Sequence, residues 1–402
     1  MALPLKGLRV IDLTKDFAGP FCTLILSELG AEVIKIEKPG TGDETRAWGP
    51  PFMNGLSYYF LSLNRGKKSI TLDLKQPASQ KAIRQLVLDS DIIVESFRPG
   101  TLAKYKLDYP SLRRVNKALI YCSISGFGQS GPYRDRPCYD ITAFAMSGIM
   151  STTGEEGRPP IRVSIPVADL AAGHYTSTAI LASLSRRLVT GRGDYIDIAL
   201  YDSIVSWLTY LSSYYFATGK QPRRMGSAHP SIVPYQAFDC KDRPLVVAVG
   251  NDTQWRNVCR ALGLEHLITE KQYSTNPLRV KNRKRLISVL SRRLKTQNCA
   301  HWTSRLARAD VPAAPVYKIA DVVRDSQVKH RKLFKFRGTG IPALSLPFKF
   351  LKDEATPQIA APRLGQHTRH VLRELGYSET AIDKIAGSTP IRRRGTLPIQ
   401  RI

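Results

Sequence analysis

Short apolar runs of strand length alternate with helix-length segments over the first 125 residues of the chain. Leu8–Leu13 and Ala31–Ile36 are two such runs, and apolar residues at helical spacing fill the segment between them until Gly30 ends it. This order predicts a βαβ unit with parallel strands and a right-handed crossover. The same pattern continues with a strand, a helix and two strands at Ser69–Leu74, Ala78–Leu88, Asp91–Glu95 and Leu119–Ile124. We therefore predict an α/β fold with a doubly wound, Rossmann-like parallel sheet.

The second half of the chain indicates a further, smaller domain. A long helix rich in small residues, a strand and another helix are predicted at Asp169–Arg187, Asp194–Leu200 and Ser203–Phe216. Residues 219–230 contain two prolines and two glycines, which is typical of a loop. A strand and three helices follow it, at Pro244–Val249, Thr253–Leu262, Arg279–Leu294 and Ala300–Ala309. We predict a large domain of residues 1–225 and 326–402, and a small α/β domain of residues 226–325.

The composition is that of a basic globular protein. Its 60 Lys and Arg residues exceed its 33 Asp and Glu residues by 27, and a chain of this charge attracts polyanions. The basic residues occur in short bursts along the whole chain, however, and the sequence contains no motif of a nucleic-acid-binding fold. We interpret the charge as a generally cationic surface, suited to a ligand that carries several phosphates. A polyanion-binding protein is the non-enzyme alternative.

Several classes of protein are disfavoured by what the sequence lacks. No apolar run approaches the roughly eighteen residues that span a bilayer, and a strand begins too near the N-terminus to leave room for a signal peptide. The six cysteines form no CxxC pair, so we expect reduced thiols. His367 and His370 lie three residues apart with no third ligand nearby, so we predict no metal site. The expected location is the mitochondrial matrix, or alternatively the cytoplasm, with no nucleic-acid or membrane partner.

The turn after the first strand argues against a dinucleotide cofactor. Glu37 ends the second strand, where a dinucleotide enzyme would hold a ribose. The first strand runs instead into Thr14–Pro20, which lacks the GxGxxG pattern. Without that pattern an NAD or FAD site is not expected.

Asp169 is the leading candidate for chemistry, because it lies where the long helix is predicted to begin. One interpretation is structural, since Asp is a favoured N-cap residue. The other is functional. The helix dipole favours an anion at this end, and an ionised carboxylate can attack a thioester if a backbone N–H stabilises the developing oxyanion. The residue types and their spacing leave both interpretations open.

A series of short motifs, in the same order along the chain, resembles the class III CoA-transferases, the family of the formyl-CoA and carnitine CoA-transferases. The resemblance extends from about residue 5 to residue 376. Its motifs are Leu8–Thr14, Ala18–Pro20, Leu29–Glu37, Gly42-Asp43, Thr45-Arg46, Asn64–Ser69, Gly126–Gln129 and Leu364–Thr368. It implies an enzyme that moves CoA between carboxylic acids and forms an interlocked homodimer. Coenzyme A would enter as the acyl-CoA substrate, with no permanently bound cofactor.

The resemblance also implies roles for individual residues. Asp169 matches the nucleophile, which carries the acyl group as a mixed anhydride and then CoA as a thioester. The implied contacts with CoA are Phe17, Ala18, Lys38, Leu72, Asp73, Leu74, Lys75, Ser96, Phe97, Arg98, Lys104, Pro137, Cys138, Tyr139 and Asp140. The Lys and Arg residues among them are suited to bind phosphates.

Two departures from the family pattern limit the chemistry that the resemblance implies. Phe17 replaces a polar residue that assists the reacting carbonyl in formyl-CoA transferases, and Pro137 replaces a lysine, which argues against formyl-CoA or oxalate chemistry. An α-methylacyl-CoA racemase of the same superfamily is the enzyme alternative. Racemases of that superfamily have a Gly-His-Asp motif where this chain has Cys138-Tyr139-Asp140, so one of the two racemase bases would be missing.

The expected acceptor is a dicarboxylic acid. The segment Gly226–Phe238 stands where relatives have a glycine-rich loop that closes over the intermediate. Its amino-acid sequence resembles that of the succinyl-CoA:glutarate branch of the family. A dicarboxylate needs a cation for its distal carboxylate, and Arg46 beside Trp48 is our candidate. His229 and Ser231 are further candidate substrate contacts. We therefore expect CoA transfer from succinyl-CoA to a dicarboxylic acid such as glutarate.

Overall fold

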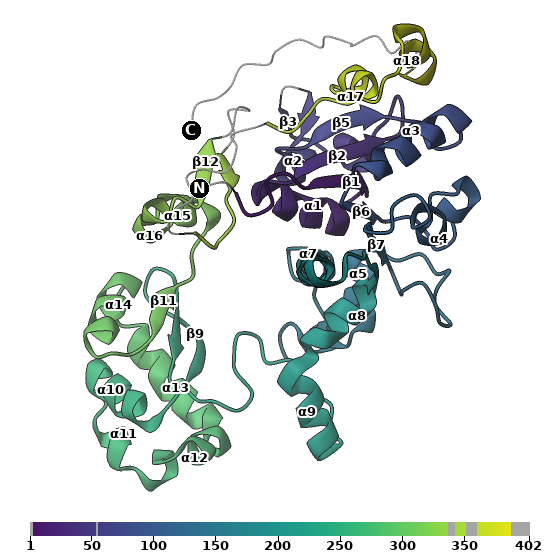
Figure 1. Cartoon of the computed structure of the whole chain (residues 1–402). Coiled ribbons are helices and arrows are strands. Elements are labelled where there is room, and N and C mark those ends of the chain that lie inside the picture. The colour runs from purple at the N-terminus through teal and green to yellow at the C-terminus, as the bar shows by residue number, and fades with distance from the viewer. Residues whose placement is uncertain (1–2, 54, 337–341, 351–359, 387–402) are drawn as a thin grey trace. The chain divides into compact units, whose positions relative to one another are not determined.

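The computed structural model describes residues 3–53, 55–336, 342–350 and 360–386 (Figure 1). The chain divides into two compact units, one of residues 1–149, 162–213 and 331–402, the other of residues 150–161 and 214–330. The predicted small domain, residues 226–325, lies within the second unit. That unit also takes in residues 150–161, 214–225 and 326–330, which were predicted to belong to the large domain.

A six-stranded parallel sheet forms the centre of the larger unit (Figure 1). The strands occur in the order β5-β2-β1-β6-β7-β8. Their bounds are β1 Arg9–Leu13, β2 Glu32–Glu37, β5 Lys68–Thr71, β6 Ile92–Glu95, β7 Ile120–Ser125 and β8 Tyr195–Ala199. Ile11 of β1 pairs with Ile34 on one side and Ile93 on the other. Most residues of β1, β6 and β7 are apolar, as expected of parallel strands that are covered on both faces, whereas β5 contains a larger share of polar residues. The predicted α/β fold is confirmed.

Helices cover both faces of this sheet. Ile11 and Leu13 share a core with residues of α3 (Pro77–Leu88), α17 (Thr368–Glu374) and α18 (Glu379–Ala386). On the other face, α1 (Ala18–Glu28) and α7 (Val167–Thr190) pack against strands of the sheet and against each other. The alternation of side chains along a strand explains this division, because Val10 and Asp12 point away from Ile11 and Leu13.

Two glycines allow close approaches that shape one end of this sheet. A Cβ atom at Gly173 of α7 would lie 2.8 Å from the carbonyl oxygen of Ala18, and one at Gly126 would lie 2.2 Å from the Cβ of Cys138. Any larger residue would push these segments apart. The two glycines therefore let the start of α1 and the segment around Cys138 lie close to the sheet and to α7.

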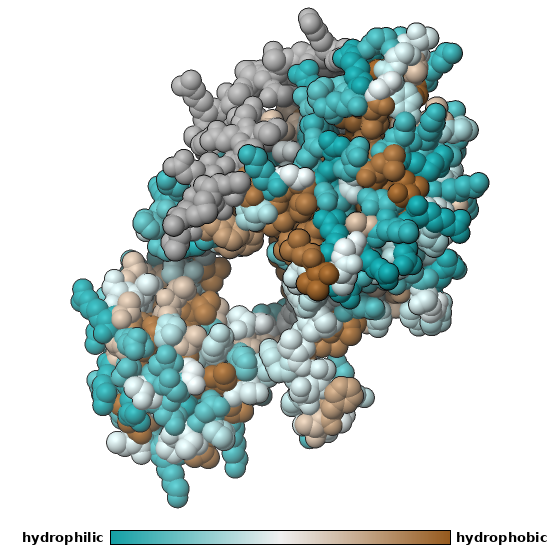
Figure 2. Space-filling view, in the orientation of Figure 1, coloured by the Kyte–Doolittle hydropathy of each residue, from teal (hydrophilic) through white to brown (hydrophobic). Residues whose placement is uncertain are grey.

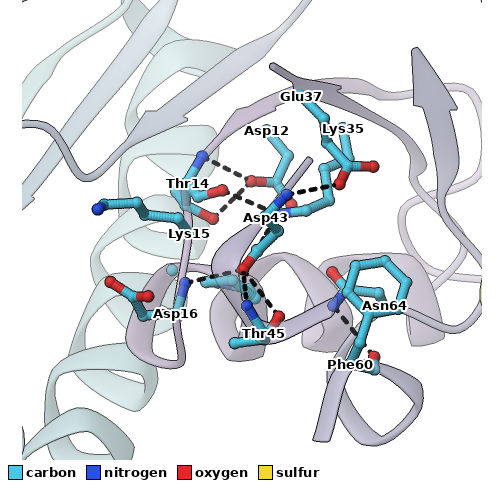
Figure 3. A network of polar contacts seen from close by, with 12 residues as sticks. Asp12, Thr14, Lys15, Asp16, Lys35, Glu37, Asp43, Thr45, Phe60 and Asn64 are labelled. Carbon is cyan, nitrogen blue, oxygen red and sulfur yellow. Dashed lines mark hydrogen bonds and ion pairs between the residues drawn. The ribbon is translucent and has the colours of Figure 1, made fainter. Parts of the chain in front are cut away.

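A buried cluster of charged side chains supports the loop that follows β1 (Figure 3). The Asp12 carboxylate accepts hydrogen bonds from the backbone N–H of Thr14 at 2.9 Å and from Lys67 Nζ at 3.0 Å. Lys35 Nζ lies 2.9 Å from Asp43 and donates to the Thr14 carbonyl oxygen at 2.8 Å. Burial alone would raise the pKa of Asp12, but Lys35 and Lys67 outweigh it and hold that pKa below its usual range. Two acids and two bases thus neutralise one another, as buried charges must.

The smaller unit has an antiparallel sheet in the order β11-β10-β9. Its strands are β9 Tyr235–Asp239, β10 Pro244–Ala248 and β11 Ala313–Pro315, and the main helices are α10 Asp252–Leu262, α13 Arg283–Leu294 and α14 Cys299–Arg308. Trp255 and Trp302 are almost fully buried in the core of this unit. The amphipathic spacing of Leu286, Leu290 and Leu294 turns α13 towards the same core.

Two predicted helices are interrupted in the structure. The segment Ser203–Phe216 is divided between α8 (Leu200–Val205) and α9 (Thr209–Thr218), and Thr209 has a left-handed φ of 40°. The helix predicted at Arg279–Leu294 becomes α12 (Asn276–Lys281) followed by α13. Asn282 lies between them, and its side-chain amide donates to the carbonyl oxygens of Gln272 and Leu278. Such local side-chain bonds compete with a continuous helix.

The surface and the cysteines agree with the composition. On the face shown in Figure 2, hydrophilic residues cover most of the visible surface of each unit, and apolar residues form separate patches. All six cysteines lie among the described residues and are unpaired. Within the described ranges, no helix combines the length and the apolar character needed to span a membrane.

Candidate active site

The site lies where the strand order of the sheet reverses. From β1 the chain passes first to β2 and β5 on one side, then to β6, β7 and β8 on the other. Ligands of open α/β sheets bind at the carboxyl ends of the strands beside such a switch point. Here the segments after β1 and β6 line a cavity of about 470 Å³ and an adjoining one of about 250 Å³. The residues that line both are Lys15, Asp16, Ser96, Ser125, Gly126, Cys138 and Tyr139. The two cavities therefore form one continuous site.

Ten of the fifteen predicted CoA contacts line this site. The larger cavity is lined by Lys38, Ser96, Phe97, Arg98, Pro137, Cys138 and Tyr139, and the smaller one also by Phe17, Ala18 and Asp140. The other five predicted contacts, Leu72, Asp73, Leu74, Lys75 and Lys104, line neither cavity. Leu72 is buried in the core of the sheet, and Asp73 accepts a hydrogen bond from the Lys75 backbone N–H. For these five residues CoA binding stays a prediction.

Asp169 lines the smaller cavity and is the third residue of α7, not its N-cap. The N-cap residue is Pro166, which makes no side-chain cap bond. Asp140 provides the cap from another segment, because its carboxylate accepts from the backbone N–H groups of Ala168 at 2.7 Å and Asp169 at 3.4 Å. The interpretation of Asp169 as an N-cap is therefore wrong, and its side chain is left to face the cavity.

The protonation state of Asp169 also differs from the expectation. Burial raises the pKa of Asp169 to about 8, and the neighbouring acids Asp140 and Asp16 add to the rise. The position at a helix N-terminus predicts an ionised carboxylate. The dipole term is small next to the desolvation of a buried carboxyl group, so the ligand-free site holds Asp169 largely protonated at neutral pH.

Asp169→Asn is expected to gain stability relative to the wild type as the pH rises. A carboxyl group with a raised folded-state pKa contributes stability that is complete below its unfolded pKa and is lost as the pH rises through the folded value. For Asp169 this interval extends from 3.8 to about 8, and asparagine does not titrate. Unfolding free energies from urea denaturation at about pH 5 and about pH 8 measure the difference.

The exposed Asp89→Asn is the control for this comparison, and its effect should be the same at both pH values. An Asp169→Asn variant whose stability relative to the wild type did not change with pH would show that the Asp169 carboxyl is solvated and ordinary.

The predicted substrate residues are divided between the two units. Trp48 lines the smaller cavity, where its ring lies 4.9 Å from that of Tyr59. The Arg46 guanidinium lines neither cavity and binds both carboxylate oxygens of Glu37 at 2.7 Å. His229 and Ser231 belong to the smaller unit, where the Ser231 backbone N–H donates to His229 Nδ1 at 3.1 Å. Their contact with substrate stays a prediction, as does that of Arg46.

Several lining residues were missed by sequence reasoning. Lys15, Arg134 and Arg136 add positive charge to the larger cavity, and Arg162 and Tyr59 line the smaller one with Asp169. Arg136 directly precedes Pro137 and Arg134 lies three residues before it, so their position beside the implied CoA contacts was the available signal. Lys15 and Arg162 come from loops and Tyr59 from the short helix α2 (Tyr58–Leu63), and their approach to Asp169 depends on the tertiary fold.

Histidine takes no visible part in the site. Among the described residues that line the two cavities there is no histidine, so the base pair of a racemase is not assembled there. His367 accepts a hydrogen bond from the Ser69 backbone N–H at its Nδ1, and His370 pairs with Glu374. Within the described residues no three His, Cys, Asp or Glu side chains come together as metal ligands.

Comparisons with known proteins agree with this arrangement. A succinyl-CoA:glutarate CoA-transferase from Mus musculus is 43% identical over 401 residues, which cover 98% of this chain and 91% of that protein. A succinate–glutarate CoA-transferase from Agrobacterium fabrum is 40% identical over 382 residues, covering 92% and 96%. The crystal structure of a CAIB/BAIF family protein from Brucella suis matches with a TM-score of 0.85 at 40% identity, covering 93% of this chain and all of that one. The family model described as CoA-transferase family III matches residues 5–368. The chain therefore belongs to the class III CoA-transferases and is an enzyme that transfers CoA.

Proposed function

We propose that this enzyme moves CoA from succinyl-CoA to a dicarboxylic acid such as glutarate, with Asp169 as the covalent carrier. The observation that carries the proposal is the position of Asp169. Its carboxyl group lines a small cavity that opens into a larger one lined by five Lys and Arg side chains. Acidic residues line the larger cavity as well, but Glu37, Asp43 and Glu44 are each paired with a cation. A reacting acid beside a cavity with several cationic side chains suits a thioester whose other end carries phosphates. The names of the similar mouse and Agrobacterium proteins support succinate and glutarate as the acids.

The first half of the reaction loads CoA onto the enzyme. A carboxylate oxygen of Asp169 attacks the acyl carbon of succinyl-CoA, the carbon–sulfur bond breaks, and CoA leaves as a thiolate. The product is a mixed anhydride between Asp169 and succinate. The thiolate then attacks the aspartyl carbonyl carbon and releases succinate, which leaves an aspartyl-CoA thioester.

The second half reverses these steps with the acceptor. A carboxylate oxygen of glutarate attacks the aspartyl carbonyl carbon and expels the CoA thiolate, which forms a second anhydride. The thiolate attacks the glutaryl carbon, and Asp169 is released as a carboxylate. No bond to water forms, so the energy of the thioester is conserved through every step.

Backbone amides at the start of α1 are suited to stabilise the oxyanions of these steps. Phe17 is the N-cap residue of α1 and makes no side-chain cap bond, and the first amides of a helix have no partner within the helix. Phe17, Ala18 and Gly19 line the same cavity as Asp169. Removing one such donor lowers kcat by roughly 10²–10³-fold in enzymes with oxyanion holes.

Arg162 is our candidate for the distal carboxylate of the dicarboxylic acid. It lines the cavity with Asp169, and it opposes the rise that burial causes in the pKa of Asp140. Its guanidinium donates to the carbonyl oxygens of Val163 and Ser164 at 3.1 and 3.3 Å. These bonds use two of its five N–H groups, so the planar guanidinium has further N–H groups that can bind a carboxylate. We prefer it to Arg46, because Glu37 occupies the guanidinium of Arg46.

Arg162→Gln is expected to raise the KM for a dicarboxylic acceptor by about 10- to 100-fold, the value of one charge-assisted hydrogen-bonded pair. A monocarboxylic acceptor of equal length should be used as before, because it has no distal charge to bind. Initial rates with glutarate and with pentanoate measure both effects. Arg158→Gln, an exposed position outside the cavities, is the control. An equal rise in KM for both acceptors would exclude Arg162 as the residue that selects dicarboxylates.

The proposed function is tested by mixing the enzyme with succinyl-CoA and a panel of free mono- and dicarboxylic acids. Mass spectrometry of the products should detect new acyl-CoA species, with glutaryl-CoA among the fastest to form. Hydroxylamine added during turnover should modify the peptide that contains Asp169. Turnover without any label on that peptide would rule out the covalent mechanism, and the absence of any dicarboxylyl-CoA product would rule out the proposed substrates. The predicted homodimer and mitochondrial location stay predictions.

A further inference from the structure

Asp16 is a second acid of the site that the proposed function does not yet use. It lines both cavities, at the point where they join. Its φ of 66° lies in the left-handed region, which residues other than glycine seldom adopt. Its Oδ1 atom is buried and, in the part of the chain that the structure describes, has no hydrogen-bond partner. Native proteins rarely leave a buried carboxylate oxygen without a hydrogen-bond partner, which indicates that this atom binds a ligand.

The surrounding loop fixes Asp16 in this unusual position. Its backbone N–H lies 3.4 Å from the Asp43 carboxylate, which is itself held by Lys35 and by the Thr45 N–H. Figure 3 shows the Asp16 carboxylate pointing away from this buried cluster, although its N–H points towards it. The next two residues, Phe17 and Ala18, begin the wall of the cavity that contains Asp169. The cluster beneath the loop therefore presents Asp16 to the site.

The surroundings of Asp16 raise its pKa. Burial raises the pKa of Asp16 to about 6, and Lys15 opposes the rise only in part. Lys15 is itself paired with Glu44 at 2.8 Å. The charged and titratable groups that act on Asp16, or on which it acts, are Lys15, Lys35, Asp43, Glu44, Tyr59 and Asp169. Because two nearby carboxylates repel each other, ionisation of Asp169 makes the neutral form of Asp16 easier to hold.

We propose that Asp16, in its protonated form, donates a hydrogen bond to the carbonyl oxygen of the acyl group that Asp169 attacks. The inference rests on the proposed function of Asp169. The proton stays on Asp16 throughout, so no proton is transferred and no further reactant is needed. Phe17 lines the same cavity, but its aromatic side chain cannot donate a hydrogen bond to this carbonyl oxygen. Asp16, one residue earlier, supplies a donor in its place. Neutral carboxylic acids act as such donors in other enzymes.

This role requires a particular distribution of protons between the two acids. The productive form has Asp16 protonated and Asp169 ionised, so the pair carries one proton. Because the pKa of Asp169 is the higher of the two, this form is the less populated arrangement of that proton, and its amount rises and falls with the singly protonated pair. Because the pair titrates near about 6 and about 8, kcat/KM should be largest between these values and fall on both sides. The fall of kcat/KM on the alkaline side reflects the loss of the last proton from the pair. It occurs because the reaction needs Asp16 in its protonated form.

Two substitutions at Asp16 distinguish the effect of losing the hydrogen-bond donor from the effect of disturbing the backbone. Asp16→Gly removes the carboxyl group and suits the left-handed backbone, and we expect it to lower kcat by about 10²-fold, as for the loss of one oxyanion donor. Asp16→Asn keeps a donor in its amide group and tolerates the same backbone. We expect Asp16→Asn to retain kcat within about tenfold and to lose the alkaline limb of the kcat/KM profile, because its donor cannot ionise.

Asp310 provides the matched control, because it is an exposed aspartate with a φ of 55° in the other unit. Asp310→Gly and Asp310→Asn should leave both kcat and the pH profile unchanged. The inference is overturned if Asp16→Gly keeps wild-type kcat, or if Asp16→Asn keeps the alkaline limb. If either of these results is obtained and Asp169→Ala is inactive, the proposed function is left intact. An active Asp169→Ala enzyme would instead overturn the proposed function, and this inference with it.

Discussion

Asp169→Ala is expected to lower the rate of CoA transfer by a factor on the order of 10⁴ or more, as for other residues that form the covalent intermediate. Alanine has no atom that can carry an acyl group or CoA. The binding of CoA should change little, because the positive side chains of the larger cavity are untouched. Formation of acyl-CoA product, followed by mass spectrometry, measures the rate. Equilibrium dialysis with free CoA measures the affinity.

Asp89→Ala is the control for this experiment, since it removes an exposed aspartate far along the chain from Asp169. It should transfer CoA at the wild-type rate. Transfer by Asp169→Ala within about tenfold of the wild type would contradict the covalent role of Asp169. A variant that had lost both transfer and CoA affinity would point to a damaged fold, and its unfolding curve would reveal this.

Lys67→Met is expected to lower the free energy of unfolding by about 3–5 kcal/mol, the usual effect of breaking a buried ion pair. Both Lys67 and Asp12 have fully buried side chains, and Lys67 Nζ lies 3.0 Å from the Asp12 carboxylate. Burial lowers the pKa of Lys67 to about 8, with Asp12 opposing the shift, so Lys67 is still charged at neutral pH. Methionine has a similar length and leaves Asp12 with one fewer cation. Urea denaturation at neutral pH measures the loss.

The adjacent Lys68 offers a matched control. Lys68 pairs with Glu32 at a position where both side chains are about 30% exposed, so Lys68→Met should change the stability by no more than about 1 kcal/mol. The double variant Asp12→Asn/Lys67→Met should recover part of the loss, because it removes both charges. A Lys67→Met enzyme as stable as Lys68→Met would show that water reaches the cluster and screens it.

Much of the fold could be predicted because it depends on local patterns. Several strands of the central sheet, such as β1 and β6, are short and mostly apolar, and Gly30 ends α1 close to its predicted end. The interruptions at Thr209 and Asn282 could not be predicted, since each depends on one backbone conformation or on one side-chain bond. The strand β9 was missed because Tyr235–Asp239 has neither a long apolar run nor a regular alternation.

The site was predictable only in part, for a different physical reason. Residue types and spacing left Asp169 undecided between an N-cap and a nucleophile, and the family resemblance favoured the second. Neither could reveal that Asp140 caps α7, that Glu37 occupies Arg46, or that Asp16 and Arg162 reach the cavity. These facts are contacts between segments far apart in the sequence. The pKa of Asp169 is likewise a property of its burial, which a single sequence does not record.

The protonation state of the Cys138 thiol determines whether the site can lose acyl groups to a side reaction with sulfur. The Cys138 side chain lines both cavities, and its pKa is raised by burial and by the neighbouring Asp169. A thiolate in that position would exchange with the incoming acyl-CoA and trap the acyl group on sulfur, as a dead-end enzyme thioester. The protonated thiol is a poor nucleophile. Burial and the nearby acids, which raise the pKa of Asp169, thus also keep the competing Cys138 thiol protonated.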